Sequence, residues 1–142
     1  MTATGLDSFD TTVQRTNVWL KEVGQQIGSD DKHKAYRATR ATLHALRDRL
    51  TLEETAQLAA QLPMLVRGFY YEGWDPTGKP LKERHKREFL AQVSREMSPD
   101  KDLDPEQAAR AVFCVLASHI DSGEIEDVEQ VLPSEIHELW PA

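Results

Sequence analysis

Apolar residues in the first half of the chain recur at steps of three and four, which is the spacing of one buried face on a helix. The first such stripe ends at Ile27, and Gly28 after it favours a helix end, so a helix is expected over residues 16–27. A second stripe runs from Tyr36 to Leu50 and predicts another packed helix. No stretch alternates with the two-residue period of a strand, and the pattern therefore predicts an all-α fold.

Two further helices are indicated by their start signals. Thr51 and Glu54 match a capping box, in which Thr51 caps the helix and the Glu54 carboxylate accepts the Thr51 amide. Pro63 suits the first turn of a short fourth helix, where no amide hydrogen is required. The first half of the chain is thus expected to hold four helices.

The second half repeats the first at a constant offset of 70 residues. Residues 13–70 align with residues 83–140 without a gap, and ten aligned pairs are identical. The identical pairs include Val23/Val93, Arg40/Arg110, Leu46/Leu116, Glu54/Glu124 and Pro63/Pro133. Apolar positions also stay apolar in the substituted pairs Trp19/Phe89, Ile27/Met97, Leu43/Phe113, Leu50/Ile120, Leu58/Val128, Val66/Ile136, Phe69/Leu139 and Tyr70/Trp140.

Because the core pattern persists over the whole repeat, the sequence predicts a helical bundle of two tandem, similar four-helix halves. Both halves belong to a single domain of residues 1–142, and a hinge at residues 71–82 joins them. Asp121 and Glu124 repeat the capping box, so helix initiation explains why Glu54 and Glu124 are identical.

Arg40 and Arg110 occupy the same position in the two halves, about 60° from the centre of the buried face at roughly 3.6 residues per turn. A structural arginine would pack its stem on the core and bond its guanidinium to a carboxylate or to helix-end carbonyls, equivalently in both halves. The alternative is a pair of anion sites, one in each half. We favour the structural role, because such arginines are commoner than ligand sites.

The segment "YYEGWDPTGKP", residues 70–80, has the glycine and lysine spacing of a phosphate-binding loop. In such a loop a Ser or Thr after the lysine holds Mg²⁺ and a buried strand comes before, whereas here Pro80 follows and a helical pattern precedes. Pro76 and Gly78 instead favour a turn. We expect the segment to be the hinge and to bind no nucleotide.

Three aromatic residues are candidates for a structural or ligand-binding role: Tyr70, Trp74 and Trp140. Tyr70 and Trp140 are equivalent in the alignment, and each is expected to close the open end of its own half. Trp74 has no counterpart and is freer to serve a function. If a pocket forms between the halves, these three side chains would line it.

The sequence contains no recognisable catalytic or metal-binding constellation. The five histidines show neither the i, i+4 spacing nor the H-E-x-x-H motif of a helical zinc site, and we expect them in solvent or at the edge of the core. Cys114 is the only cysteine, so no internal disulfide can form, and no basic partner marks it as a nucleophile. We therefore expect a protein that is not an enzyme and needs no cofactor.

The composition narrows the class of protein further. The 142 residues are 39% hydrophobic and 29% charged, which is ordinary for a globular protein. No apolar run reaches the roughly 20 residues that span a bilayer, and "MTATGLDSFD" lacks the pattern of a signal peptide. With its single cysteine, the chain is expected in the cytoplasm and away from membranes.

Charge is uneven along the chain, whose net charge is −7. Residues 1–70 carry nine basic and eight acidic side chains, whereas residues 71–142 carry eight and sixteen. The acidic half repels phosphate backbones, and the short basic stretch from Lys79 to Arg87 should give only weak, salt-sensitive contact, so no DNA binding is expected. Any partner is expected to be a protein, and a basic one if it meets the acidic residues 122–131.

Four strings carry a likeness to a known family: "TNVWLKEVGQQIG", "AYRATRATLHALRDRL", "AAQLPMLVRGFYYEGWDPTGKP" and "VLPSEIHELWP". From about Thr16 onward the chain resembles a bacterial family known only as a domain of unknown function, number twenty-two sixty-seven. The resemblance implies an all-helical cytoplasmic bacterial protein of two similar halves. It implies no activity, cofactor or site residue.

Two functions remain open from the sequence. The first is a non-enzymatic helical scaffold that binds another protein, which the lack of a catalytic constellation and the charged two-part pattern favour. The alternative is a binder of a small apolar ligand in a pocket between the two halves, lined by Tyr70, Trp74 and Trp140.

Overall fold

A computed structural model describes residues 4–98 and 102–142 of the chain. Within these residues there are eight α-helices and no strand, which confirms the all-α prediction. In chain order the helices are α1 (Asp7–Ile27), α2 (Lys32–Arg47), α3 (Leu52–Ala60), α4 (Met64–Tyr71), α5 (Lys86–Met97), α6 (Pro105–His119), α7 (Ser122–Val131) and α8 (Ser134–His137). Across this part of the chain, no helix combines the length and the apolar character needed to cross a bilayer.

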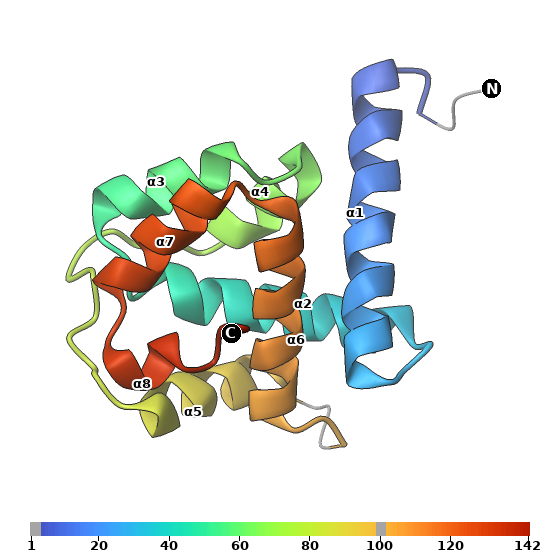
Figure 1. The fold of residues 1–142 in the computed structure, drawn as a ribbon. Coiled ribbons are helices and arrows are strands. Elements are labelled where there is room, and N and C mark those ends of the chain that lie inside the picture. The colour runs from blue at the N-terminus through green and yellow to red at the C-terminus, as the bar shows by residue number, and fades with distance from the viewer. Residues whose placement is uncertain (1–3, 99–101) are drawn as a thin grey trace.

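Helix α2 lies at the centre of the molecule, and α6 crosses it (Figure 1). Helices α1, α4 and α5 also pack on α2, while α1, α5 and α7 also pack on α6. Because neighbours approach α2 from several sides, every residue from Ala41 to Leu50 is buried, although the sequence predicted burial on one face only. Tyr36, at the other end of the predicted stripe, is exposed.

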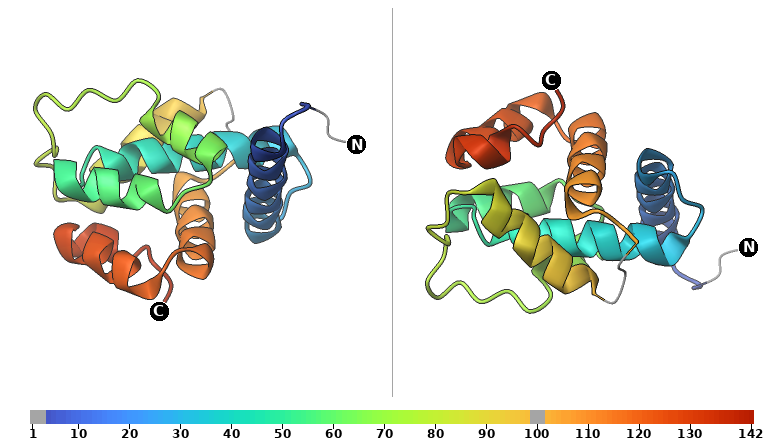
Figure 2. Two further views of the ribbon diagram at one scale, coloured as in Figure 1. Left: turned by 90° about the horizontal axis from the view of Figure 1, so that it is seen from above. Right: turned by 90° about the horizontal axis from the view of Figure 1, so that it is seen from below.

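The helices pack on one another within each half and also across the two halves. Helix α5 packs on α2, α1 packs on α6, and α3 packs on α7 (Figure 2). The apolar residues of both halves form one continuous core, in which Leu43 and Phe113 are fully buried. A residue in one half therefore meets much of its environment in the other half.

Several helices start at the spacing that the sequence predicted. Helix α3 begins at Leu52 and α7 at Ser122, and α4 begins at Met64 and α8 at Ser134. Helices α1 and α5 differ in length, with 21 and 12 residues. The extra turns of α1, residues 7–15, reach α4, where the buried Thr12 side chain accepts the Leu65 amide over 2.9 Å (Figure 1).

Local signals explain where individual helices begin and end. Thr51 caps α3, because its side chain accepts the Glu54 amide over 3.1 Å. Gly28 ends α1 in the left-handed conformation, with φ of +70°, as its position after the apolar stripe predicted. Pro63 precedes α4 as its cap residue, one position earlier than the sequence suggested.

Residues 72–85, which we call the linker, connect α4 to α5 and lie outside the helices. The Arg47 guanidinium donates to the Glu72 carbonyl oxygen over 2.9 Å near the start of the linker. Near its end, the Leu81 amide donates to the Asp48 carbonyl oxygen over 2.7 Å. The C-terminal end of α2 therefore fastens the linker at two points.

Candidate functional site

Tyr70 and Trp140, two of the aromatic candidates, lie inside the core. Tyr70 is fully buried, its hydroxyl donates to the Thr55 carbonyl oxygen over 2.9 Å, and burial raises the pKa of that hydroxyl above its usual value. Trp140 is also buried and stacks on Phe113, with ring centroids 4.2 Å apart. Both side chains fill the interior instead of lining an open pocket.

Trp74, the third candidate, belongs to an aromatic cluster at the start of the linker. Its ring centroid lies 5.5 Å from that of Tyr71, and the Tyr71 centroid lies 5.2 Å from that of Tyr70. The Trp74 indole nitrogen is buried without a hydrogen-bond partner. Because Trp140 stacks on Phe113 in the core, these contacts do not gather the three aromatic candidates around one pocket.

Arg40 and Arg110 bond carboxylates of the chain itself, but not in equivalent ways. Arg40 Nη2 lies 2.6 Å from Glu72 Oε1, and this hydrogen bond raises the pKa of the guanidinium. Arg110 is more exposed and lies 2.8 Å from Glu106 Oε2, one helical turn earlier, and 3.2 Å from the Glu138 carbonyl oxygen. The predicted equivalence is therefore wrong, because Glu72 follows the eight-residue α4 and has no counterpart after the four-residue α8.

The part of the linker that resembles a phosphate-binding loop folds as a turn. The Lys79 amide donates to the Pro76 carbonyl oxygen over 3.1 Å, and Gly78 between them has φ of +73°, which glycine adopts freely. Asp75 accepts the Thr77 amide over 2.9 Å, and this bond lowers the pKa of the Asp75 carboxyl. The turn predicted from Pro76 and Gly78 is right, and a helix precedes it where a phosphate loop would need a strand.

Acidic residues of α8 and its C-terminal end neutralise part of the basic stretch. Lys86 Nζ lies 2.7 Å from Glu138 Oε1, and this hydrogen bond raises the pKa of Lys86. His85 Nδ1 lies 3.0 Å from Glu135 Oε2. Outside these pairs, the stretch has four further cations, of which Lys79 is half-buried and Lys82, Arg84 and Arg87 are exposed. Four cations are fewer than the roughly 6–10 phosphate contacts that make DNA binding strong.

His44 departs from the prediction that the histidines lie in solvent or at the edge of the core. It is buried, with Nδ1 2.7 Å from Glu96 Oε1 and Nε2 2.6 Å from the Phe69 carbonyl oxygen. Burial favours a raised pKa for Glu96, but the hydrogen bonds from His44 and Gln92 outweigh it and lower that pKa. The prediction failed because α5, distant in sequence, covers this side of α2.

A cluster of acidic side chains lies where α3 packs against α7. Glu54 and Glu124 are only 7% and 8% exposed, whereas Asp127, one turn further along α7, is exposed. One carboxylate oxygen from each of the three residues lies within 4.8 Å of the other two. Glu54 Oε1 and Glu124 Oε2 are buried without a hydrogen-bond partner. We call Glu54, Glu124 and Asp127 the acidic cluster.

The capping-box prediction was right for Thr51 and wrong for Glu54. The Glu54 carboxylate faces Glu124 and Asp127 instead of accepting the Thr51 amide. The sequence held a signal for this arrangement, because Glu54 lies four residues before Leu58 and Glu124 lies four residues before Val128. A glutamate on the apolar face of a helix, repeated at the same position, indicates a buried carboxylate in each half.

The electrostatics of the acidic cluster favour a bound positive charge. Burial and the neighbouring Glu54 and Asp127 carboxyls together raise the pKa of Glu124 to about 8. Among the described residues, the ion pairs that neutralise other buried charges do not reach Glu54 or Glu124. Near neutral pH the cluster can lower its energy by taking up a proton or a cation.

An apolar groove of about 410 Å³ lies between α1, α2 and α4. Val13, Tyr36 and Leu65 stand on its walls and are exposed. Phe9 lies one turn before Val13 on α1 and extends the apolar wall beyond the groove, and Glu72 lies at its edge. We call this feature the α1–α4 groove.

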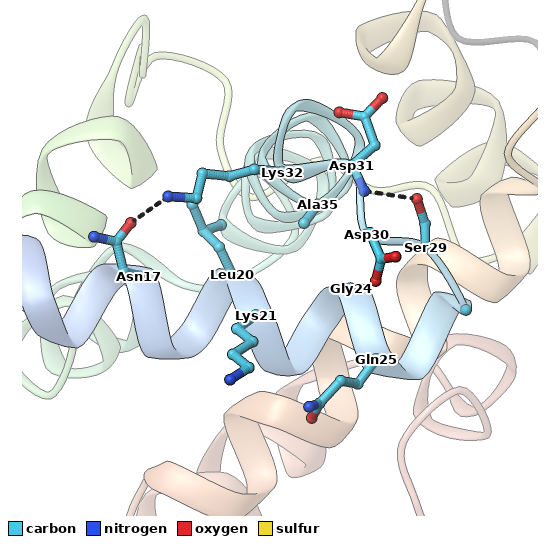
Figure 3. A pocket seen from close by; sticks show the side chains of 11 residues that line it. Asn17, Leu20, Lys21, Gly24, Gln25, Ser29, Asp30, Asp31, Lys32 and Ala35 are labelled. Carbon is cyan, nitrogen blue, oxygen red and sulfur yellow. Dashed lines mark hydrogen bonds between the residues drawn. The ribbon is translucent and has the colours of Figure 1, made fainter.

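A more polar pocket of about 540 Å³ lies at the corner where α1 ends and α2 begins (Figure 3). Lys32 Nζ donates to Asn17 Oδ1 over 3.1 Å, and the Ser29 hydroxyl accepts the Asp31 amide over 3.0 Å. Lys21 points away from both of these bonds in Figure 3. The polar groups of this pocket therefore do not converge on one point.

A comparison with known protein families shows to which family the chain belongs. A family profile described as "Uncharacterized conserved protein (DUF2267)" matches residues 16–139. The chain belongs to this family. The DUF2267 match confirms the resemblance drawn from the sequence, and it spans α2 to α8 together with α1 from Thr16 onward. Phe9 and Val13 of the α1–α4 groove lie before the matched region. Among curated proteins, the chain has no significant match.

Proposed function

We propose that this DUF2267 protein is a non-enzymatic helical module of the bacterial cytoplasm that binds a protein partner through the α1–α4 groove. The observation that carries the proposal is the exposed apolar wall formed by Val13 and Leu65 and continued by Phe9. Contiguous apolar surface of this kind on a soluble protein often marks an interaction site. A groove between helices suits the apolar face of a partner helix.

The partner is expected to carry basic side chains beside its apolar face. Glu72 lies at the edge of the groove and stays exposed beside its ion pair with Arg40. The whole chain has a net charge of −7, so complementary charge would raise the association rate and disfavour acidic competitors.

A non-enzymatic role is supported by the use that the chain makes of its polar groups. His44, Arg40 and Arg47, which a catalytic site could have used, bond Glu96, Glu72 and backbone carbonyls within the protein. The small-ligand alternative draws no support from Tyr70 and Trp140, because both are buried against protein atoms.

The same proposal includes an origin of the fold in duplication, with the two halves related by an approximate two-fold axis. Support comes from the helix starts 70 residues apart and from α5 packing on α2 as α1 packs on α6. A two-fold axis brings equivalent positions face to face, and Glu54 meets Glu124 in this way.

The partner can be tested with a photo-crosslinking amino acid at position 9 in the native bacterium. Leu65→Glu places a charge on the groove wall, and Leu52→Glu is its matched control, because Leu65 and Leu52 are 45% and 47% exposed. We expect one discrete protein to be captured by the parent chain and by Leu52→Glu, and to be lost with Leu65→Glu. Equal capture by both variants, or capture only of a second copy of the chain, would contradict a heterologous partner at the groove.

A further inference from the structure

The acidic cluster has the geometry of a cation site that joins the two halves. Glu54 comes from α3, and Glu124 and Asp127 come from α7 at the i, i+3 spacing that puts both on one helix face. Their three carboxylate oxygens lie within 4.8 Å of one another. Oxygens that bind one ion can be separated by no more than twice the metal–oxygen distance, which is about 5 Å for Ca²⁺ and about 4.2 Å for Mg²⁺.

A second observation points to a missing partner in the cluster. Glu54 Oε1 and Glu124 Oε2 are buried and accept no hydrogen bond, and both residues are more than nine-tenths buried. A buried carboxylate without a partner is costly, and such groups in folded proteins are usually paired or bound to a metal. The unpartnered oxygens belong to the two residues that face each other across the α3–α7 contact.

A shared proton is the competing solution. One proton between Glu54 and Glu124 would satisfy a single pair of oxygens and would leave Asp127 as an unneutralised charge beside them. One divalent ion would contact all three carboxylates and balance more of their charge. Asp127 is exposed, so an ion could enter from solvent and keep water as its remaining ligands.

We propose that Glu54, Glu124 and Asp127 bind a hard divalent cation of the size of Ca²⁺. The ligand set is made only of carboxylate oxygens, which suits Ca²⁺, whereas zinc sites draw mainly on Cys and His. Because the ligands come from both halves, the ion links α3 to α7 and stabilises the folded chain by binding it more tightly than the unfolded chain.

The test uses the full-length protein after treatment with a chelator, and titrates CaCl₂ at constant ionic strength. We expect a saturable rise in melting temperature and a binding isotherm in calorimetry, with MgCl₂ giving a weaker response. Affinity should fall at acidic pH, because protons compete with the ion for the carboxylate oxygens. A response of equal size to MgCl₂ and CaCl₂ would contradict the size argument.

Three variants separate the site from general attraction to an acidic protein. Glu124→Gln and Asp127→Asn should each weaken Ca²⁺ binding at least tenfold, whereas Glu126→Gln, an exposed acid between them on α7, should bind like the parent. Asp127→Asn changes an exposed residue, so it should fold even if Glu124→Gln does not. No saturable response up to about 10 mM CaCl₂ would overturn the proposal, since sites of the weaker extracellular class bind at about 0.1–1 mM. Equal weakening in all three variants would also overturn it.

Discussion

The α2–α5 contact and the α1–α6 contact are built from three equivalent pairs of positions, each pair 70 residues apart in the sequence. The residues at these positions, and the interactions that they make, differ between the two contacts. In the α2–α5 contact, the Arg49 guanidinium lies 5.3 Å from the centre of the Phe89 ring. Arg49 Nη1 also donates to Gln92 Oε1 over 2.7 Å and to the Ala45 carbonyl oxygen over 2.9 Å. A cation, an aromatic ring and an acceptor thus meet at one point.

In the α1–α6 contact, His119 takes the position of Arg49. Its ring stacks on Trp19, with centroids 4.8 Å apart and 20° between the planes. His119 Nε2 lies 2.8 Å from Glu22 Oε1, and Glu22 takes the position of Gln92. Both contacts therefore contain an aromatic residue and a hydrogen-bond acceptor. They differ in the basic group, which is an arginine in the α2–α5 contact and a histidine in the α1–α6 contact, and in the solvent exposure of that group.

The linker accounts for the difference between the two contacts. Glu83 of the linker lies 2.5 Å from Arg49, whose side chain is 1% exposed, whereas the His119 side chain is 32% exposed. Burial lowers the pKa of the Arg49 guanidinium, and the charges of Glu83 and Asp48 counteract that shift. A covered polar contact leaves unsatisfied groups when one partner is removed, whereas water can replace the partner in an open contact. Burial of the contact, more than the identity of its residues, should therefore set its energy.

Among single substitutions compared at one pH, the largest expected effect is at Arg49. Arg49→Met keeps most of the volume of the side chain and removes the donor to Gln92 and Ala45, so the free energy of unfolding should fall by about 3 kcal/mol. Urea unfolding measures this loss, and His119→Met is the matched control. A loss no larger than that of the control would show that the linker does not distinguish the two contacts.

The α3–α7 contact brings together one glutamate from each helix, Glu54 and Glu124. Unlike the α2–α5 and α1–α6 contacts, it should make the free energy of unfolding depend on pH. In the chelated protein, the pKa of Glu124 is about 8 against an ordinary 4.5, so the folded state holds a proton that the unfolded state releases between these values. The free energy of unfolding should therefore fall as pH rises from about 4.5 to 8, by at most about 1.4 kcal/mol per pH unit.

Glu124→Gln should remove most of this fall, because the amide does not titrate, whereas Glu126→Gln should keep it. Urea unfolding at several pH values in the presence of a chelator measures both slopes. Parallel pH profiles for the parent and Glu124→Gln would place the titration elsewhere.

His119→Ala should have a smaller effect than Arg49→Met. The variant loses a ring stacked on Trp19 and a half-exposed contact with Glu22, which together stabilise the fold by about 1 kcal/mol. Thermal unfolding should show a modest decrease in melting temperature. A loss as large as that at Arg49 would mean that solvent access to the contact has little influence on its energy.

The smallest effects are expected at the two identical arginines. Arg40→Ala should cost about 1 kcal/mol or less, and Arg110→Ala less than about 0.5 kcal/mol, because both ion pairs are open to solvent. Urea unfolding of the two variants checks the order. If Arg110→Ala costs more than Arg40→Ala, exposure is the wrong guide for these pairs.

Sequence patterns anticipated the features that depend on neighbouring residues. The steps of three and four gave the helices, Thr51 gave the start of α3, and Gly28 gave the end of α1. The turn at Gly78 was predictable for the same reason, because proline and glycine restrict the backbone locally.

Features that depend on distant residues were missed. Periodicity tells which face of a helix is buried but not which helix covers it, so the partners of His44 on α5 could not be inferred. Glu54 had a sufficient local explanation in the capping box, and that explanation hid its contact with Glu124. Two equivalent acids can be recognised as facing each other only if the symmetry of the packing is considered together with the repeat.

The contacts between the two halves predict how the protein behaves after its backbone is cleaved. Because α5 lies on α2 and α1 lies on α6, a proteolytic nick in the linker would leave two fragments that each cover the core of the other. Such fragments are expected to stay associated and to reassemble when they are expressed separately. By the same logic, two intact chains at high concentration could exchange their second halves and form a domain-swapped dimer, with the linker passing from one copy to the other.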